Sequence, residues 1–234
     1  MSDAKRVRMS AKERREQLVG VARSLFAERG YEATSVEEIA ERAGVSKPIV
    51  YQHFGGKEGL YAVVVDREVT TLTAAITAAM DSSNPKLEAQ GAADAFLRYI
   101  EEREEGFRVL LRDAPTGMGA GSFASVIADV AARAEGLLLD EFGERGFDED
   151  AAPMYARMLV GAVALVGEWW LEVREPSREQ VAAHVVNLLW NGLGRLEPQP
   201  RPVPAPPRTS PSPTSPPPLR VAKPPDEQRP SAGA

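Results

Sequence analysis

Several side chains near the amino end could contact the edges of DNA bases: Lys47, Pro48, Tyr51 and Gln52. A lysine can donate to guanine O6 or N7, a glutamine can pair with adenine N6 and N7, and a proline can touch a thymine methyl group. On a short helix over 47–54 these positions point away from Val50 and Phe54, which we expect to anchor the helix to the protein. The pattern therefore predicts a helix that reads the major groove.

Two short helices joined by a tight turn would position this surface. Ser35 can cap the first helix, and Glu38, three residues later, completes a capping box. Gly44 supplies the left-handed residue that ends that helix. Ser46 can cap the second helix, and Pro48 falls in its first turn, where no backbone donor is lost. A helix, a glycine turn and a second helix in this order are typical of a helix-turn-helix.

The same stretch resembles the signature of the TetR family of bacterial transcription regulators. The matching elements, within residues 12–61, are Gly30-Tyr31, Thr34-Ser35, Gly44-Val45-Ser46, Tyr51-x-His53-Phe54 and Lys57-Glu58-x-Leu60. The resemblance implies an all-α fold of about nine helices, with an N-terminal three-helix DNA-binding domain followed by a helical ligand-binding and dimerisation domain. It also implies a sequence-specific regulator, usually a repressor, that binds a palindromic operator as a homodimer and is released by a small effector.

The resemblance and the helix ends together suggest which residues bind DNA: Thr34, Ser35, Ser46, Lys47, Pro48, Tyr51, Gln52, His53 and Lys57. By resemblance Tyr51 contacts a backbone phosphate, whereas His53 is either a phosphate contact or a packing residue. Thr34, Ser35 and Lys57 lie at helix starts, which attract phosphates. The basic residues of the amino-terminal arm could enter the minor groove, although a role in solubility is an equal alternative.

Charge is divided unevenly along the chain. The net charge is −6, yet residues 1–57 carry 11 Lys and Arg against 8 Asp and Glu, and residues 58–196 carry 12 against 23. Positive charge thus gathers where phosphate contact is expected. With no cysteine, only two histidines and no serine nucleophile motif, no catalytic constellation assembles, and we expect neither an enzyme nor a metal or cofactor site.

Four regions follow from composition. Residues 1–9 are a basic flexible arm, 10–57 the helix-turn-helix domain, 58–196 the effector-binding and dimerisation domain, and 197–234 a disordered tail with 14 of the 19 prolines. The longest apolar run is about half a membrane span, and no signal-peptide pattern opens the chain, so we expect a cytoplasmic protein without membrane contact.

Caps and periodicity predict helices over 11–29, 57–80, 85 onward, 107–112, 123 onward, about 150 onward, and 178–193. Small residues would allow close helix approach in a dimer (Gly161, Ala162, Ala164 and Gly167), next to an apolar stripe (Val181, Val185, Leu188 and Leu189). The alternative is that both helices belong to the core of one chain.

A mostly apolar effector pocket is expected among the middle helices, lined by Phe96, Tyr99, Ile100, Phe107, Leu110, Leu111, Phe123, Ile127, Leu165 and Trp169. Such a lining favours an apolar effector. The glycine-rich segment 116–121 is predicted to be a flexible gate. Two other functions remain open: a ligand-independent architectural DNA-binding protein, and a protein that binds a partner through its proline-rich tail.

Overall fold

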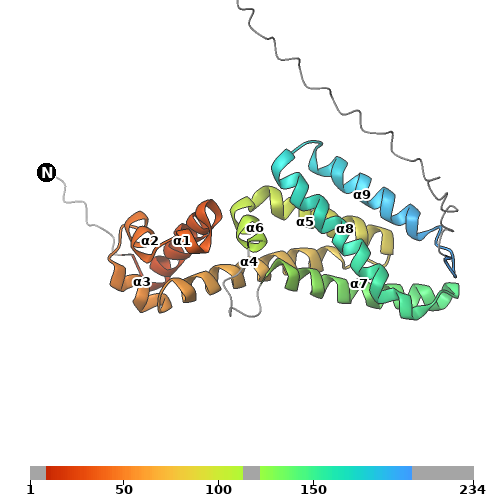
Figure 1. The fold of residues 1–234 in the computed structure, drawn as a ribbon, viewed down its shortest axis with the longest axis horizontal. Coiled ribbons are helices and arrows are strands. Elements are labelled where there is room, and N and C mark those ends of the chain that lie inside the picture. The colour runs from red at the N-terminus through yellow and green to blue at the C-terminus, as the bar shows by residue number, and fades with distance from the viewer. Residues whose placement is uncertain (1–8, 113–121, 202–234) are drawn as a thin grey trace, which may run out of the picture. The chain divides into compact units, whose positions relative to one another are not determined.

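The computed structural model describes residues 9–112 and 122–201. All regular structure in these two ranges is helical (Figure 1). The α-helices are α1 (Ala11–Ala33), α2 (Val36–Arg42), α3 (Lys47–Phe54), α4 (Lys57–Ala79), α5 (Pro85–Glu102), α6 (Glu104–Leu111), α7 (Phe123–Arg145), α8 (Ala152–Val173) and α9 (Arg178–Leu193), with a short 3-10 turn η1 (Glu149–Ala151). This confirms the predicted all-α fold. The arm over 1–8, the glycine-rich gate and nearly all of the proline-rich tail lie outside the described residues.

Most of the predicted helix starts are capped as expected, but Ser46, predicted to cap α3, makes no side-chain capping hydrogen bond. Ser10 Oγ accepts from Glu13 N at 3.2 Å while Ser10 N donates to Glu13 Oε2 at 2.7 Å, which completes a capping box for α1. Asn84 caps α5, with Pro85 as its first residue. At α2 only half of the predicted box forms, because Ser35 accepts from Glu38 N whereas the Glu38 side chain pairs with Arg29.

Some helix boundaries differ from the prediction. α1 continues to Ala33, with Gly30 interrupting the regular backbone at φ +83°. α6 begins three residues earlier than expected, at Glu104, because Glu104 and Glu105 supply the acidic first turn that the helix dipole favours. The acidic run near residue 150 forms η1 before α8 begins at Ala152.

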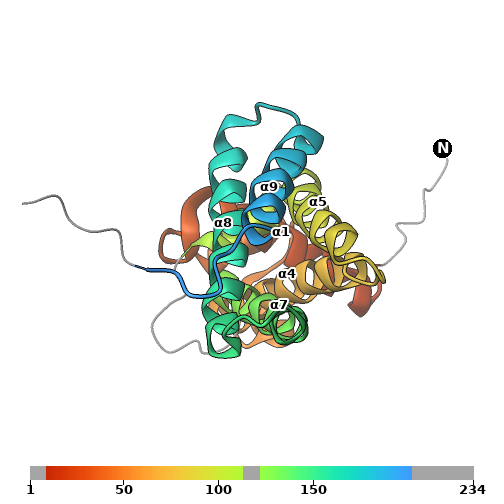
Figure 2. The same ribbon diagram turned by 90° about the vertical axis from the view of Figure 1, so that its right-hand side faces the viewer.

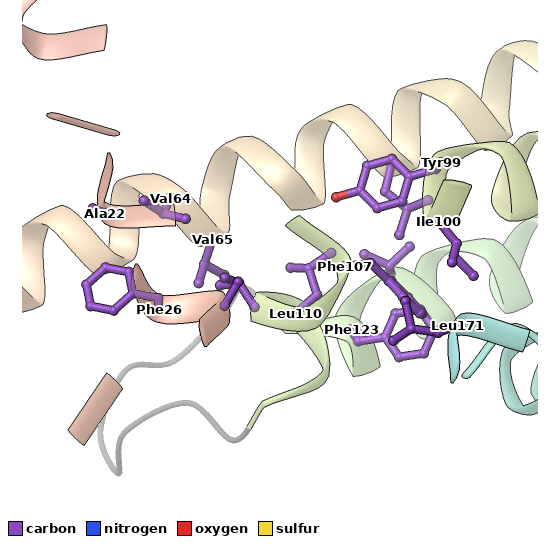
Figure 3. Packing of buried hydrophobic residues seen from close by; sticks show 14 of the residues in the cluster. Ala22, Phe26, Val64, Val65, Tyr99, Ile100, Phe107, Leu110, Phe123 and Leu171 are labelled. Atoms are coloured by element: carbon purple, nitrogen blue, oxygen red, sulfur yellow. The ribbon is translucent and has the colours of Figure 1, made fainter. Parts of the chain in front are cut away.

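One continuous apolar core joins the amino-terminal helices to the rest of the described chain (Figure 3). Phe26 of α1 lies edge-on to Tyr61 of α4, with 5.0 Å between the ring centroids. Farther along α4, Phe107 of α6 packs edge-on against Phe123 of α7 at 5.1 Å. α4 contacts α1, α3, α5, α6 and α7, and α6 contacts α1, α4 and α5, so these two helices are elements through which the two halves can influence each other.

The carboxy-terminal half is a bundle of α4, α5, α7, α8 and α9, seen from its far end in Figure 2. α7 packs on α8, and α5 packs on both α8 and α9. Gly167 allows the α5–α8 contact, because a Cβ there would overlap the ring of Phe96 and lie 2.8 Å from Ile100 Cδ1. The side of α8 that carries Gly167 therefore faces α5 and is the inner face of α8.

This packing corrects part of the predicted dimer surface. Ala164 and Gly167, expected to face a second chain, are buried against α5 within one chain, and Val181 and Val185 of α9 are buried as well. Small residues permit close approach equally well within a chain and between chains, and here α8 packs on α5 and α7 of its own chain. Gly161 has open space in front of it, and Leu188 is 72% exposed.

Candidate nucleic-acid interface and effector cavity

α3 is fixed to the protein along one side. It has eight residues, too few for an isolated helix to be stable in water. Val50 is completely buried in the core shared with α1 and α2, as predicted, and Phe54 is half-buried with the Arg15 guanidinium 4.9 Å from its ring centroid. Gly55 ends the helix at φ +74°, a backbone conformation that favours glycine.

The opposite side of α3 is open to solvent. All four side chains predicted to contact bases are exposed there, at helical spacings that place them together: Lys47, Pro48, Tyr51 and Gln52. Tyr51 is 48% exposed, although it is a large aromatic residue. An exposed helix face that combines a cation, an amide and a phenol on a rigid anchor has the chemistry needed for base contacts.

Lys47 is held by a neighbour in the free protein. Its Nζ pairs with the Glu37 carboxylate of α2 and lies 5.7 Å from the Tyr51 ring centroid. The hydrogen bond between the two groups raises the pKa of Lys47 and lowers the pKa of Glu37. Because both side chains are exposed, separating them costs little. The Glu37 pair therefore leaves Lys47 available to donate to a base.

The predicted phosphate contacts divide into accessible and internal groups. Ser35 and Ser46 are exposed, and the Ser46 hydroxyl makes no capping hydrogen bond. Thr34 is 2% exposed, and its hydroxyl donates to Gly30 O at 2.7 Å. The kink of α1 at Gly30 thus withdraws the Thr34 hydroxyl from the surface, and we remove Thr34 from the candidate DNA contacts.

Lys57 and His53 also have internal contacts. Lys57 Nζ donates to Tyr31 O at 2.9 Å and lies 4.2 Å from the Tyr31 ring centroid. This lysine therefore ties the start of α4 to the end of α1 and retains only part of its donor capacity for phosphate. His53 is half-buried beside Phe54, with 6.0 Å between the ring centroids. This position is compatible with both predicted roles for His53, packing and phosphate contact.

A cavity of about 440 Å³ lies in the bundle, bounded by α4, α5, α7, α8 and α9. This volume falls in the range of small-molecule sites, about 300–1,000 Å³. Most of its wall is apolar, and the larger contributing side chains include Met80, Phe96, Phe123, Ile127, Leu189 and Trp190. The helices that bound the cavity include α4, which also contacts the DNA-binding half.

Three of the predicted pocket residues line this cavity: Phe96, Phe123 and Ile127. Another group lies outside its wall, in the core that leads toward α1: Tyr99, Ile100, Phe107, Leu110 and the half-buried Leu111 (Figure 3). Leu165 and Trp169 are 66% and 50% exposed. Because Ala164 and Gly167 occupy the inner face of α8, Leu165 and Trp169 project outward, and their predicted place in the pocket is wrong.

A buried carboxylate connects the two halves of the described chain. Glu68 of α4 is 2% exposed and accepts hydrogen bonds from Tyr99 Oη of α5 at 2.8 Å and from Nε of Arg103, the residue between α5 and α6, at 3.0 Å. Arg23 of α1 completes the cluster, with its Nη1 3.5 Å from Glu68 Oε1. Gly106 of α6 packs directly on this carboxylate, where a Cβ would overlap Oε2. Elements α1, α4, α5 and α6 therefore meet at one charged group.

The charge state of the cluster follows from its contacts. Burial alone would raise the pKa of Glu68, but the hydrogen bonds from Arg103 and Tyr99 outweigh burial, and the net effect lowers the pKa below its usual value. Burial, together with the adjacent carboxylate, raises the pKa of Tyr99. At neutral pH Glu68 is therefore charged and Tyr99 remains a protonated donor.

Two carboxylates of interest did not stand out as functional candidates in the sequence, although a signal was present. Glu68 follows Val64 by four residues and precedes Leu72 by four, so it shares their buried face. Glu88 precedes Phe96 by eight residues on the cavity face of α5. In both cases a lone acid on an apolar stripe is the indication, since an unpaired carboxylate is rarely buried.

Comparison with known proteins agrees with the geometry. Residues 18–64 match the family model described as bacterial regulatory proteins of the tetR family, and residues 86–192 match a tetracyclin repressor-like C-terminal domain. The chain is 31% identical over 192 residues to the transcriptional activator FasR of Mycolicibacterium smegmatis, covering 81% of this chain and 87% of the relative. It is 33% identical over 155 residues to a transcriptional repressor of Mycobacterium tuberculosis, covering 66% and 70%.

Solved structures show the same fold. A TetR-like transcriptional regulator from Rhodococcus sp. RHA1 superposes with a TM-score of 0.65 at 26% identity, covering 80% of this chain and 99% of that one. The ketosteroid transcriptional regulator KstR2 of Mycobacterium tuberculosis superposes with a TM-score of 0.62 at 22% identity, covering 80% and 98%. Within the described residues, none of the helices is both long and apolar enough for a membrane span. The relatives are DNA-binding transcription regulators rather than enzymes, and this chain belongs to the TetR family.

Proposed function

We propose that this protein is a ligand-responsive regulator that binds a palindromic operator as a homodimer and is released by a small apolar effector. The observation that supports this proposal best is that one helix, α4, contacts both the DNA-binding helices and the helices around the cavity. The side of α3 that carries Lys47, Tyr51 and Gln52 is exposed, an apolar cavity lies in the bundle, and α4 contacts both parts. The main alternative is a ligand-independent architectural protein. That alternative assigns no function to the cavity.

A dimer would supply the two-fold symmetry that a palindromic operator requires. One short α3 contacts few base pairs, so helix-turn-helix proteins pair their recognition helices about 34–36 Å apart. A suitable surface exists on α8, where exposed apolar side chains recur at helical spacings: Met154, Met158, Leu165, Trp169 and Val173. Leu188 extends exposed apolar surface onto α9. An apolar surface of this kind is typical of a protein interface.

The effector would act through α4. A ligand in the cavity favours one arrangement of α4 to α8, and tilting α4 changes the distance between the two recognition helices. The Glu68 cluster resists independent movement of α1, α4 and α5, so a shift of α4 is passed to α1. A coupling free energy of about 1–3 kcal/mol would weaken operator binding about 5- to 150-fold.

The position of the operator would set the sign of regulation. We expect repression where the bound dimer overlaps a promoter and activation where it lies upstream of one. The relatives include both an activator and a repressor. The predicted repressor role is therefore tested by mapping the operator relative to the transcription start.

Fluorescence anisotropy tests the proposed function. Purified protein is titrated into labelled duplexes tiling the DNA next to its gene, with random competitor DNA at modest ionic strength. We expect one duplex containing an inverted repeat to bind at least about a thousandfold more tightly than scrambled DNA. Equal affinity for all duplexes would refute sequence-specific regulation. Saturation at one protomer per inverted repeat, rather than two, would refute the dimer.

A further inference from the structure

Glu88 is a buried acid in the wall of the apolar cavity. It is 7% exposed, and it lies on the same face of α5 as Ala92 and Phe96, four and eight residues later, which also line the cavity. Helical periodicity therefore directs the Glu88 side chain toward the space that Phe96 borders. A carboxylate at this place is unusual, because acidic residues are rarely buried without a partner.

Glu88 has only one hydrogen bond within the described ranges. Ser82 N donates to Oε1 at 3.4 Å, near the long limit for a hydrogen bond. No lysine, arginine or histidine of the described residues lies within the 4.0 Å that defines an ion pair with it. By comparison, Glu68, which is 2% exposed, has three hydrogen bonds and contacts two arginines. The first turn of α5, where Glu88 lies, also favours a negative charge, but this interaction supplies no further direct hydrogen bond. The buried carboxylate therefore keeps acceptor capacity that a ligand donor could use.

Other charges around the cavity have the same sign. The residues that line it include Asp140, Glu141 and Glu144 of α7, against a single cation, Arg145. Arg145 is itself 3.4 Å from Glu141, so its charge is partly compensated. Arg133 also lies close, since its Nη2 donates to the carbonyl oxygen of the lining residue Met80 at 3.3 Å. The lining acids still outnumber the nearby cations, which disfavours a carboxylate or phosphate and favours a cation or a neutral donor.

We propose that Glu88 is the polar recognition residue of the cavity. The effector is then an apolar molecule with one hydrogen-bond donor, an ammonium or a hydroxyl group, which donates to the Glu88 carboxylate. This inference rests on the proposed function, in which the cavity binds an effector. The apolar body of the ligand contacts the aromatic and aliphatic wall. Its donor supplies the hydrogen bond that the carboxylate lacks, and an ammonium group also supplies the opposite charge.

Three probes of equal chain length separate the possible head groups: decylamine, 1-decanol and decanoate. Isothermal titration calorimetry of the full chain at pH 7, below the micelle concentrations, gives their dissociation constants without DNA. We expect decylamine to bind most tightly and decanoate most weakly, with at least about a tenfold difference, because a hydrogen bond between charged groups is stronger than one between neutral groups. Tightest binding of decanoate, or no binding of any probe, would overturn the proposal.

A matched pair of variants assigns the preference to Glu88. E88Q keeps the shape of the side chain and removes its charge, and we expect it to reduce the ratio of decylamine to decanoate affinity about tenfold. E102Q removes an exposed acid of the same helix that does not line the cavity, and it should change that ratio less than about threefold. An unchanged ratio in E88Q, or an equal change in E102Q, would overturn the proposal, and the wild-type ranking tests it even if E88Q does not fold.

The two hypotheses fail separately. If the probes rank as expected but none of them alters operator affinity, the ligand-responsive mechanism is wrong and the role of Glu88 in recognition stands. If operator binding is specific but the probes rank in the opposite order, the regulator stands and the donor-bearing effector is wrong.

Discussion

The clearest stability prediction concerns the replacement of Glu68 by glutamine. The variant keeps the size of the side chain but removes the charge that two arginines and one tyrosine contact. Breaking a fully buried ion pair from one side costs about 3–5 kcal/mol. The side chains of Arg103 and Arg23 are 37% and 32% exposed and can rehydrate, so this figure is an upper bound. We expect Glu68→Gln to lower the free energy of unfolding by about 1.5–3 kcal/mol.

Urea unfolding at pH 7 measures this loss, at equal protomer concentrations because association stabilises a dimer. Glu105→Gln is the control, since Glu105 also contacts Arg23 but is half-exposed, and it should lose less than about 1 kcal/mol. Acid provides a second test. The lowered pKa of Glu68 stabilises the fold above pH 4.5, and this contribution disappears as the pH falls through the folded-state pKa. A loss no larger than that of Glu105→Gln, or a difference that persists undiminished in acid, would refute the reasoning.

Three further changes test other parts of the molecule. Gln52→Ala should cost about 1–3 kcal/mol of operator binding and relax one base-pair position, whereas a uniform loss over all duplexes in anisotropy would point to a phosphate contact instead. Gly167→Val should lower the free energy of unfolding by about 1–3 kcal/mol through overpacking against α5, while Gly161→Val, facing open space, should lose less; equal urea midpoints would contradict this packing. Leu165→Arg should convert the dimer to a monomer in sedimentation velocity, and Leu139→Arg, an exposed control on α7, should not; a dimer that survives Leu165→Arg would exclude this surface.

The DNA-binding half was largely predictable because its signals are local. The caps at Ser10 and Ser35, the turn at Gly44 and the anchor at Val50 depend on residues only a few positions away, and the structure contains all of them. Thr34 was misplaced because its burial depends on the kink at Gly30, and a threonine at a helix start is compatible with both an exposed and a buried hydroxyl.

The carboxy-terminal half was less predictable because its contacts join distant segments. Helical periodicity indicates that Gly167 and Leu165 lie on different faces of α8, but it does not indicate which face packs on α5. The exposed positions of Leu165 and Trp169 follow only after α5 is placed. The cavity is similarly non-local, since its wall combines five helices. Glu88 becomes a candidate binding residue only when these five helices are placed together.

The central hypothesis is that residues 47–52 enter the major groove twice per symmetric operator. Selection of bound duplexes from a random library, carried out with the wild type and with Gln52→Ala, tests it most directly. We predict that the wild type enriches an inverted repeat and that the variant relaxes one position in each half-site, symmetrically about the centre. A wild-type selection without an inverted repeat, or identical preferences in the two proteins, would contradict it.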